Sequence, residues 1–199
     1  MIDEFTLDAS GWARFSEDRK FRYRLGRSLV PGARLSLIDG RVLGLSFEEA
    51  PTLWTRELIR IVFLMLNPST ADAFKVDPTV NKCCQFAVRW GAHIIEVVNL
   101  FALRSPDPKS LDAAVEVGDD MANDQAILDA CTGASRVIAA WGNNGHRWGR
   151  GNIVADRLKR AGIELLHLGM TGDGFPLHPL ARGKAFIPLT REPILWSST

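Results

Sequence analysis

The sequence predicts an α/β fold: a three-layer α/β/α sandwich around a mostly parallel four-stranded sheet, with an N-terminal β-hairpin extension. From residue 57 onward, apolar runs suited to strands buried on both faces alternate with segments of helical spacing. Right-handed connections between such strands place helices on both faces of the sheet. Residues 1–55 instead alternate apolar and polar side chains, as antiparallel strands do. We therefore expect two parts, a hairpin extension over residues 1–55 and a sandwich over residues 56–199.

The extension contains a strong hairpin signal. The runs RLSLI and RVLGLSF flank Asp39-Gly40, a dipeptide typical of a tight turn between two strands. Phe21-Arg22-Tyr23-Arg24-Leu25 alternates in the same way. The segment is also rich in cations, which either share a face that binds phosphates or form a solvated strand face. These are Arg14, Arg19, Lys20, Arg22, Arg24, Arg27 and Arg34.

The first two strands of the sheet are predicted at residues 61–66 (IVFLML) and 94–98 (IIEVV). Residues 78–90 between them have helical spacing, with Asp77-Pro78 as a typical helix start and Gly91 as a stop. Further along we expect a short helix opening at Ser110-Leu111-Asp112, a helix over 119–130, a strand over 136–140, a helix over 148–161 and a strand over 164–168. From Gly169 the chain has the composition of a long loop, and such loops are usually functional or disordered.

Composition limits the classes of function. The 199 residues, 46% hydrophobic and 24% charged, suit one sizeable core. No apolar run approaches the roughly 20 residues of a membrane helix, and the acidic start MIDEFTLDAS is unlike a signal peptide. We therefore expect a cytoplasmic protein without a membrane partner. The net charge of +1 neither demands nor excludes a nucleic-acid partner, and the oligomeric state is not predicted.

The sequence lacks the usual signatures of metal and nucleotide cofactors. Cys83, Cys84 and Cys131 have no metal-ligand spacing, and we expect buried, reduced thiols. The four histidines are scattered without an HExxH motif, and there is no GxxxxGK[ST] loop. We expect neither a metal nor a cofactor.

Polar motifs follow each of the four predicted strands, and in open α/β sheets ligands bind at this edge. Asn67-Pro68 follows the first strand; its amide could orient a water or a substrate group, or it could form an Asx-turn. Ser69 and Thr70 come next, and their hydroxyls could bind phosphate or cap a helical turn. Arg104, in the loop after the second strand, is a further candidate for binding phosphate.

The other three strands end in similar motifs. Asn99 offers the donors and the acceptor needed to read a nucleobase edge, or is a buried amide that satisfies loop backbone. Gly142 allows close approach of the backbone to a ligand. His178, in a Gly/Pro-rich loop, could donate to a developing anion, transfer a proton or stabilise its loop. Arg182 and Lys184 just beyond it either reach phosphates or form a solvated tail.

Taken together, the motifs LNPSTAD, VVNLFALR, AAWGNNG and GDGFPLHPL resemble an uncharacterised bacterial family built on a domain of unknown function. The resemblance covers about residues 20–190. It implies no activity.

More distantly, the chain resembles the uracil-DNA glycosylase superfamily, in which Asn-Pro or Asp-Pro, Asn, Trp-Gly and His-Pro follow the four strands of a parallel sheet in this order. The resemblance implies that Asn67 positions a water, that Asn99 recognises a base and that His178 stabilises the departing base as an anion. It also implies that Phe74 or Phe101 stacks on the base.

This chain departs from that pattern in three respects. Asn67 replaces the carboxylate of the most active members, which implies slow chemistry. Leu180 follows Pro179 where a small Ser is usual, and Met65 or Leu66 stands where a Gly normally precedes the first motif.

We therefore expect a protein that binds a nucleobase or nucleotide, with hydrolysis of an N-glycosidic bond in DNA or in a modified nucleotide. The alternative is a noncatalytic module that binds nucleic acid or a nucleotide. A third reading, a hydrolase using Ser69 or Thr70 with His178, lacks a GxSxG elbow. A flipped base needs no metal or redox cofactor for its release.

Overall fold

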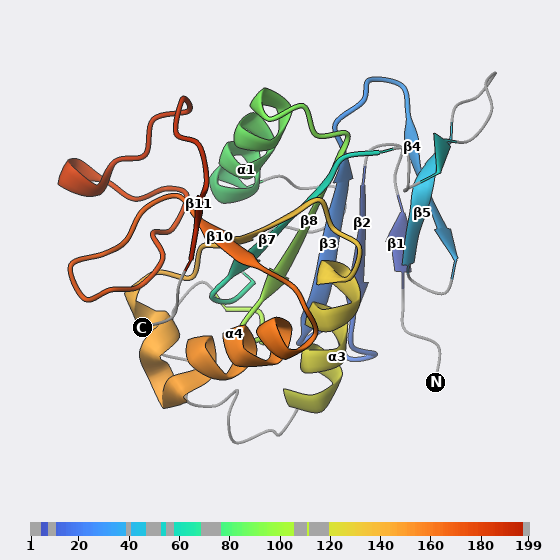
Figure 1. Cartoon of the computed structure of the whole chain (residues 1–199). Coiled ribbons are helices and arrows are strands. Elements are labelled where there is room, and N and C mark those ends of the chain that lie inside the picture. Colours follow the sequence, from blue (N-terminus) through green and yellow to red (C-terminus); the bar gives the residue numbers. More distant parts are fainter. Residues whose placement is uncertain are drawn as a thin grey trace.

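A mixed sheet forms the middle layer of the protein in the computed structural model, which describes residues 5–7, 11–38, 41–46, 53–54, 58–68, 77–105, 111 and 120–196 (Figure 1). Its strands lie in the order β1-β2-β3-β8-β7-β9-β10-β11, and β4, β5 and β6 form a separate small sheet. The elements of the N-terminal half are β1 Phe5–Leu7, β2 Gly11–Phe15, β3 Arg22–Ser28, β4 Arg34–Ile38, β5 Arg41–Ser46, β6 Leu53–Trp54, β7 Arg60–Met65, α1 Pro78–Arg89 and β8 Ile94–Asn99. Those that follow are α3 Asp120–Cys131, β9 Arg136–Ala139, the 3-10 helix η3 Asn143–Gly149, α4 Arg150–Arg160, β10 Leu165–His167, the 3-10 helix η4 Gly183–Ala185 and β11 Ile194–Leu195.

The α/β class is confirmed, but the prediction of a four-stranded sheet is wrong. The central strands β8, β7, β9 and β10 are parallel, as expected. However, β3 pairs antiparallel with β8, β2 and β1 continue the sheet beyond it, and β11 closes the other side. The sheet therefore has eight strands within the described part of the chain. Alternation in a sequence predicts a strand but not its partner, so it does not show that β3 joins the large sheet.

The predicted hairpin itself is present. β4 and β5 pair antiparallel, from Arg34 opposite Ser46 to Ile38 opposite Arg41, and β6 adds a third strand. The Asp39-Gly40 turn lies outside the described residues. Residue 55 follows this small sheet, whereas β1, β2 and β3 belong to the large one; the division into two domains at this residue stays a prediction.

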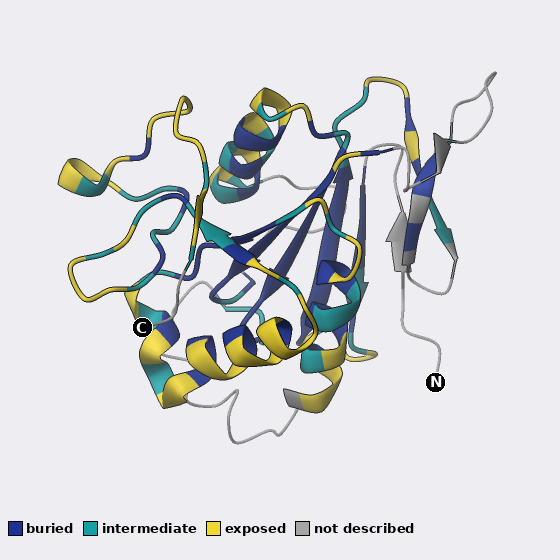
Figure 2. Cartoon of the chain, in the orientation of Figure 1, coloured by how far each residue is buried: buried dark blue, intermediate teal, exposed yellow. Residues whose placement is uncertain are grey.

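The two faces of the large sheet are covered by different helices. Ile61, Phe63 and Met65 of β7 pack with Val80, Cys83 and Phe86 of α1 on one face. Val62 and Leu64 pack with α3 and α4 on the other face, through Ile127, Val154 and Leu158 among others. Strands β7 and β8 are buried throughout, β10 is partly exposed, and the outer sides of the helices are exposed (Figure 2). Successive residues of β7 alternate between the two faces, and all of them are buried because helices cover both faces.

Helix α1 begins and ends where the sequence predicts. The Asp77 side chain accepts a hydrogen bond of 2.8 Å from the backbone N–H of Val80, and Pro78 occupies the first turn. Pro lacks the N–H that would otherwise need a partner there. At the other end Gly91 adopts a φ of +73°, which L-residues rarely adopt. This cap places the Asp77 carboxylate at the carboxyl edge of the sheet.

The cysteines are free, as predicted. Cys83 and Cys131 are buried and Cys84 is half-buried. Burial raises the pKa of the Cys131 thiol to about 12 and that of the Cys83 thiol well above its ordinary value. Within the described residues, no helix is both long and apolar enough to cross a membrane.

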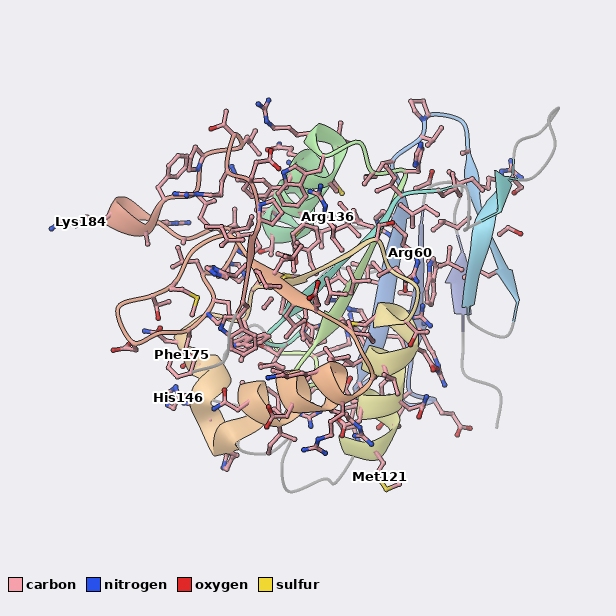
Figure 3. The ribbon with its side chains drawn as sticks, in the orientation of Figure 1. Arg60, Met121, Arg136, His146, Phe175 and Lys184 are labelled. Carbon is pink, nitrogen blue, oxygen red and sulfur yellow. The ribbon has the colours of Figure 1, made fainter. Side chains whose placement is uncertain are left out.

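A buried ion-pair cluster joins three neighbouring strands of the large sheet. Glu96 of β8 accepts from Arg24 of β3 at 2.5 Å and from Arg60 of β7 at 2.8 Å. Arg60, which Figure 3 labels, also donates to the backbone oxygens of Ala130 and Thr132 at the end of α3. Buried charges need partners of this kind because desolvation is expensive. The arginines of the alternating N-terminal segment are therefore partly interior.

The order of the parallel strands creates a crevice. Across the sheet the parallel strands lie in the order β8-β7-β9-β10, so the chain leaves β7 toward β8 on one side and leaves β9 toward β10 on the other. Such a switch point opens a ligand site at the carboxyl ends of the two strands.

Candidate functional site

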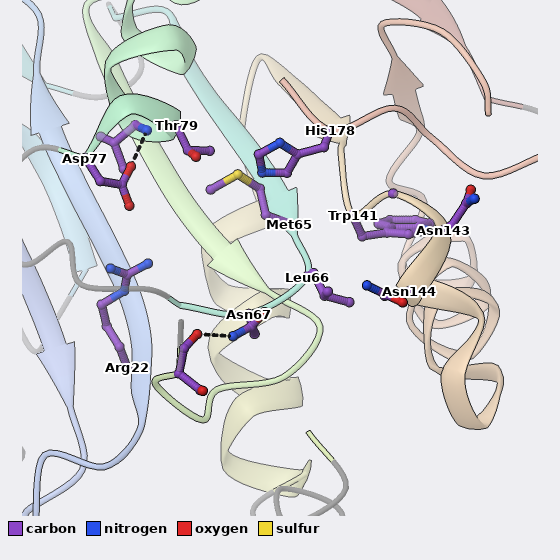
Figure 4. Close-up of a pocket in the computed structure, with 13 residues that line it drawn as sticks. Arg22, Met65, Leu66, Asn67, Asp77, Thr79, Trp141, Asn143, Asn144 and His178 are labelled. Atoms are coloured by element: carbon purple, nitrogen blue, oxygen red, sulfur yellow. Dashed lines mark hydrogen bonds between the residues drawn. The ribbon is translucent and has the colours of Figure 1, made fainter. Parts of the chain in front are cut away.

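A pocket of about 330 Å³ lies at this switch point (Figure 4). Its volume is at the lower end of the roughly 300–1,000 Å³ of small-ligand sites. Loops after β7, β8 and β9, the start of α1, strand β3 and the C-terminal loop all contribute to its wall. The lining residues are Arg22, Met65, Leu66, Asn67, Asp77, Thr79, Val80, Ser105, Trp141, Gly142, Asn143, Asn144 and His178.

Asn67 has a fixed orientation in this pocket. Its Nδ2 donates to the backbone oxygen of Ser105 at 2.8 Å and to that of Pro68 at 3.3 Å. Ser105 N–H in turn donates to the oxygen of Pro68 at 2.9 Å, which holds the two loops together. Since carbonyl oxygens can only accept, the amide nitrogen must be on their side. The Oδ1 of Asn67 makes no hydrogen bond with the described residues and remains an acceptor for a ligand or a water.

His178 is also fixed in orientation. The backbone N–H of Leu180 donates to its Nδ1 at 3.2 Å, so the proton of the neutral ring is on Nε2. Burial lowers the pKa of His178 below its ordinary 6.5, and the nearby Asp77 carboxylate opposes that shift. The ring is therefore neutral at pH 7 and serves as a hydrogen-bond donor through Nε2.

The loop after β9 connects the two sides of the pocket. Gly142 has a φ of 69° and a ψ of −170°, a conformation open essentially to glycine alone. Its N–H donates to the oxygen of Pro176, two residues before His178, at 2.8 Å. Asn143 donates to Asp173 at 2.7 Å, and His146 packs on Phe175 with ring centroids 5.7 Å apart (Figure 3). These contacts hold the His178 loop against the strand ends.

Four charged or hydroxyl side chains that line the pocket were not among the predicted site residues: Arg22, Asp77, Thr79 and Ser105. Arg22 of β3 lines the pocket although it is only 2% exposed, and Figure 4 shows its guanidinium pointing toward Asp77. Asp77 and Thr79 come from the start of α1. The helix-start motif predicts the place of Asp77 but not that it faces a ligand. No local pattern predicts Arg22, because its position follows from the pairing of β3 with β8.

Asn99 lies next to the pocket without lining it. It is 0% exposed, and neither Oδ1 nor Nδ2 has a hydrogen-bond partner in the described part of the chain. Its backbone oxygen accepts from Asn123 at 3.1 Å. The Asn99 side chain therefore does not form hydrogen bonds with loop backbone groups, which was one of the two interpretations of this residue. The amide faces the same side of the sheet as Met65, its register partner on β7.

The remaining predicted residues lie elsewhere. Phe101 is buried against Trp148, with ring centroids 5.7 Å apart, and does not line the pocket. Arg104 stacks on Phe15 and donates to the oxygen of Arg19 at 3.2 Å. Arg182 and Lys184 are exposed on the C-terminal loop, where Figure 3 labels Lys184, and Pro68 is buried beside Asn67. Ser69, Thr70 and Phe74 lie outside the described residues.

One protein-family model matches the part of the chain that contains the strand-end motifs. The model described as "Protein of unknown function (DUF1643)" matches residues 52–180. The chain belongs to the DUF1643 family. The matched range contains β7 to β10 with Asn67, Asn99, Gly142 and His178, so the DUF1643 region supplies most of the pocket. Arg22 lies outside it. No curated protein and no solved structure matched the chain.

Proposed function

We propose that this protein binds a nucleobase or nucleotide at the switch point of its sheet and hydrolyses an N-glycosidic bond there. One observation carries the proposal: Asn67 and His178, far apart in sequence, line one pocket with their side chains held in defined orientations. An oriented acceptor and an oriented neutral donor are what hydrolytic release of a base requires. The resemblance of the strand-end motifs to uracil-DNA glycosylases supports the same reading, as analogy.

The two side chains have complementary roles in this reaction. Asn67 Oδ1 accepts a hydrogen bond from a water molecule and orients the water oxygen toward the anomeric carbon. The bond from that carbon to the base nitrogen breaks, and its electron pair leaves with the base. His178 Nε2–H donates to the base as this negative charge develops, and such donors act mainly in the transition state. A neutral donor in a buried site is well suited to the task because it needs no reorganisation.

The water must also lose a proton, and Asn67 is not basic. Asp77 is the only carboxylate among the described residues that line the pocket. Its Oδ1 accepts from Val80, which leaves Oδ2 to take the proton. The hydroxyl then remains on the sugar and the proton can return to the departing base anion. Atoms and charge balance without a cofactor.

Arg22 extends the proposal toward a nucleotide. A guanidinium binds phosphate oxygens through two parallel hydrogen bonds, and this one lines the pocket from its β3 side. We therefore place the phosphate or the sugar backbone of the ligand on the side of Arg22 and the base on the side of His178.

The rival proposal is a noncatalytic module that binds a nucleotide or nucleic acid through the same pocket. It is favoured by the neutral amide of Asn67 at the water-positioning point, because an amide cannot act as a base. Release of a base distinguishes the two proposals.

The decisive experiment measures base release from oligonucleotides that contain uracil, mismatches or modified bases. His178→Ala should lower turnover by ~100- to 1000-fold, the usual loss for a single donor to a developing anion. His167→Ala is the matched control, since His167 Nδ1 also accepts a backbone N–H two residues on, at 3.0 Å, but does not line the pocket. Equal turnover by the His178 variant and the wild type would reject the mechanism. No turnover by the wild type, with ligand binding retained, would favour the rival.

Binding to nucleic acid is tested by titration with single- and double-stranded oligonucleotides at increasing salt. With a net charge of +1, affinity must come from local cations near the site, so it should weaken steeply with salt. Charge-removing variants at Arg182 and Lys184 should reduce this salt dependence. Absence of binding at low salt would restrict the ligand to a free nucleotide.

A further inference from the structure

Two arginines from distant parts of the chain contact the same phenylalanine ring. The guanidinium carbon of Arg19 lies 4.4 Å from the centroid of the Phe15 ring, and that of Arg104 lies 5.0 Å from it. Nη1 of Arg104 also donates to the backbone oxygen of Arg19 at 3.2 Å. Phe15 is 0% exposed, whereas both arginines are partly exposed. We call Arg19 and Arg104 the arginine pair; the ring and the carbonyl hold its two like charges near each other.

The arginine pair adjoins the pocket. Phe15 of β2 is the register partner of Arg22 on the antiparallel strand β3, so their side chains leave the same face of the sheet about 5 Å apart. Arg22 lines the pocket from the β3 side, and Ser105, the residue after Arg104, lines it as well (Figure 4). The backbone N–H of Arg104 donates to the oxygen of Lys20 at 2.9 Å, which ties the two segments together. Three arginine side chains therefore lie around Phe15, and one of them lines the pocket.

The charge of Arg104 is not balanced by a carboxylate within the described part of the chain. Its contacts there are an aromatic ring and a carbonyl oxygen. The interior arginines differ in this respect, since Arg24 and Arg60 share the carboxylate of Glu96. Cations held close together without a counter-charge attract an anion from solution. The surface around Phe15 is therefore suited to an anionic ligand.

The turn that carries Arg19 holds this residue in an unusual backbone conformation. Its φ of +56° lies in the left-handed region, which glycine and asparagine adopt most readily. The Arg19 N–H donates to the oxygen of Ser16 at 2.9 Å, and the Asp18 carboxylate accepts from the Ser16 hydroxyl and pairs with Lys20. Strained residues of this kind are concentrated at functional sites. A turn with only a structural role would be more stable with glycine at this position.

We propose that the arginine pair binds the phosphate backbone of a single nucleic-acid strand, one nucleotide of which occupies the pocket. This rests on the proposed function and deepens it, because it assigns a polymer rather than a free nucleotide as the ligand. A guanidinium binds phosphate oxygens through two parallel hydrogen bonds, and cations that follow one another along a groove track a single strand. Arg19 lies outside the matched residues 52–180, so the complete pair is not contained in the DUF1643 region.

The first test compares two probes by calorimetry: deoxyuridine monophosphate, and a short single-stranded oligodeoxynucleotide with one uracil. Arg19→Gln and Arg104→Gln should each weaken binding of the oligonucleotide ~10-fold, a loss typical of a hydrogen bond to a charged group. Affinity for the monophosphate should not change. The slope of log affinity against log salt should become shallower by ~0.7 for each lost phosphate contact.

Arg160→Gln is the matched control for this test. Arg160 is exposed at the end of α4, where the chain approaches the start of β10 and hence the opposite edge of the sheet from the pocket. Its replacement should leave both affinities and the salt slope unchanged. Oligonucleotide affinity and a salt slope that stay at the wild-type values in both pair variants would overturn the proposal.

The second test separates phosphate binding from the stability of the turn. Glycine adopts a positive φ without strain, so Arg19→Gly should unfold at about the same temperature as the wild type and yet bind the oligonucleotide ~10-fold more weakly. Arg19→Lys keeps the charge but not the two parallel hydrogen bonds, and its affinity should lie between the two. Wild-type affinity in Arg19→Gly would contradict a contact between Arg19 and phosphate.

These outcomes distinguish the arginine pair from the proposed function. If the pair variants bind the oligonucleotide weakly and no substrate releases a base, the phosphate contacts stand and hydrolysis is rejected. If the wild type and the pair variants bind the oligonucleotide equally and release its base at equal rates, hydrolysis at the pocket stands and the phosphate contacts are rejected.

Discussion

At His178, burial and one backbone hydrogen bond decide the state of the imidazole. Burial lowers its pKa from 6.5 and the Asp77 carboxylate partly opposes this. The N–H of Leu180 fixes the tautomer. Both effects keep the ring neutral with Nε2–H available, and this follows from the loop conformation rather than from a catalytic partner.

This lowered pKa predicts a pH dependence of stability. The unfolded chain binds a proton at His178 more readily than the folded protein does, so stability is fully present above about pH 6.5 and falls as pH decreases through the window below it. The thermal midpoint of the wild type should therefore drop between about pH 7.5 and 5.5. His178→Gln should reduce this drop, and calorimetric scans of both proteins would show it. An equal drop in both would contradict burial of the neutral ring.

Asp77 offers a matched substitution at the same site. Asn caps helices about as well as Asp does, whereas Ala costs about 1 kcal/mol. Asp77→Asn should thus leave unfolding nearly unchanged, while removal of the carboxylate lowers the pKa of His178 further. Asp77→Ala should be less stable than both. The pKa is measured by NMR titration of the imidazole, and an unshifted value in Asp77→Asn would show that the carboxylate does not act on the ring.

Three of the residues that the sequence predicts in the segments after the strands line the pocket. Asn67, Gly142 and His178 all line it. Arg22 was named only within a cation-rich segment, because alternation does not show which strand β3 joins. Nor does sequence show that Met65 and Asn99 are register partners on neighbouring strands, since no local pattern records the register.

At the scale of elements, the Arg24–Glu96–Arg60 cluster fixes how β3, β8 and β7 meet. Glu96 is fully buried and serves two arginines. Arg60 reaches the last carbonyls of α3, so the cluster also holds that helix to the sheet.

Breaking this cluster should lower the free energy of unfolding substantially. Glu96→Gln leaves two buried guanidinium groups without their counter-charge, and loss of one partner of a buried ion pair costs about 3–5 kcal/mol. Glu192→Gln is the control, because Glu192 and Arg136 are 4.0 Å apart and partly exposed, where such pairs contribute about 0–1 kcal/mol. Urea unfolding measures both changes. Similar losses for the two variants would mean that the buried cluster is not a stabilising contact.

Elements with local signals were predicted well. Helix α1, the parallel strands and α4 are predicted by helix-capping residues, by glycines that end helices and by the spacing of apolar residues. The eight-stranded sheet was not predicted, since β3 pairs with β8 some 70 residues later, and no local pattern records such a partner.

At the scale of the whole molecule, a contact between two tryptophans links the C-terminal segment to the pocket. Trp196 packs edge-on against Trp141 with ring centroids 5.3 Å apart, and the backbone N–H of Trp196 donates to the backbone oxygen of Leu165 at 2.8 Å. Trp141 lines the pocket. Trp196, the last described residue, therefore supports the pocket wall at Trp141.

Removing this support should affect both stability and binding. Trp196→Ala should lower the free energy of unfolding by ~2 kcal/mol through lost ring contact and apolar burial. It should also weaken binding of a pocket ligand about fivefold, or ~1 kcal/mol. Trp148→Ala is a useful comparison, because Trp148 is half-exposed and does not line the pocket. If Trp196→Ala binds as the wild type does, Trp141 holds its place unaided.

The pairing of β3 with β8 bears on how this protein can be dissected. A recombinant fragment limited to residues 52–180, the range of the family match, would lack β3 and carry an uncovered β8. The hydrogen-bonding groups of Ile94 to Val97 that face β3 would then form an open edge of the kind that recruits other chains and aggregates. The same cut removes the guanidinium of Arg22 from the pocket. The smallest soluble and binding-competent unit must therefore begin upstream of β3, and insolubility of the shorter fragment would reflect a missing strand rather than an unstable core.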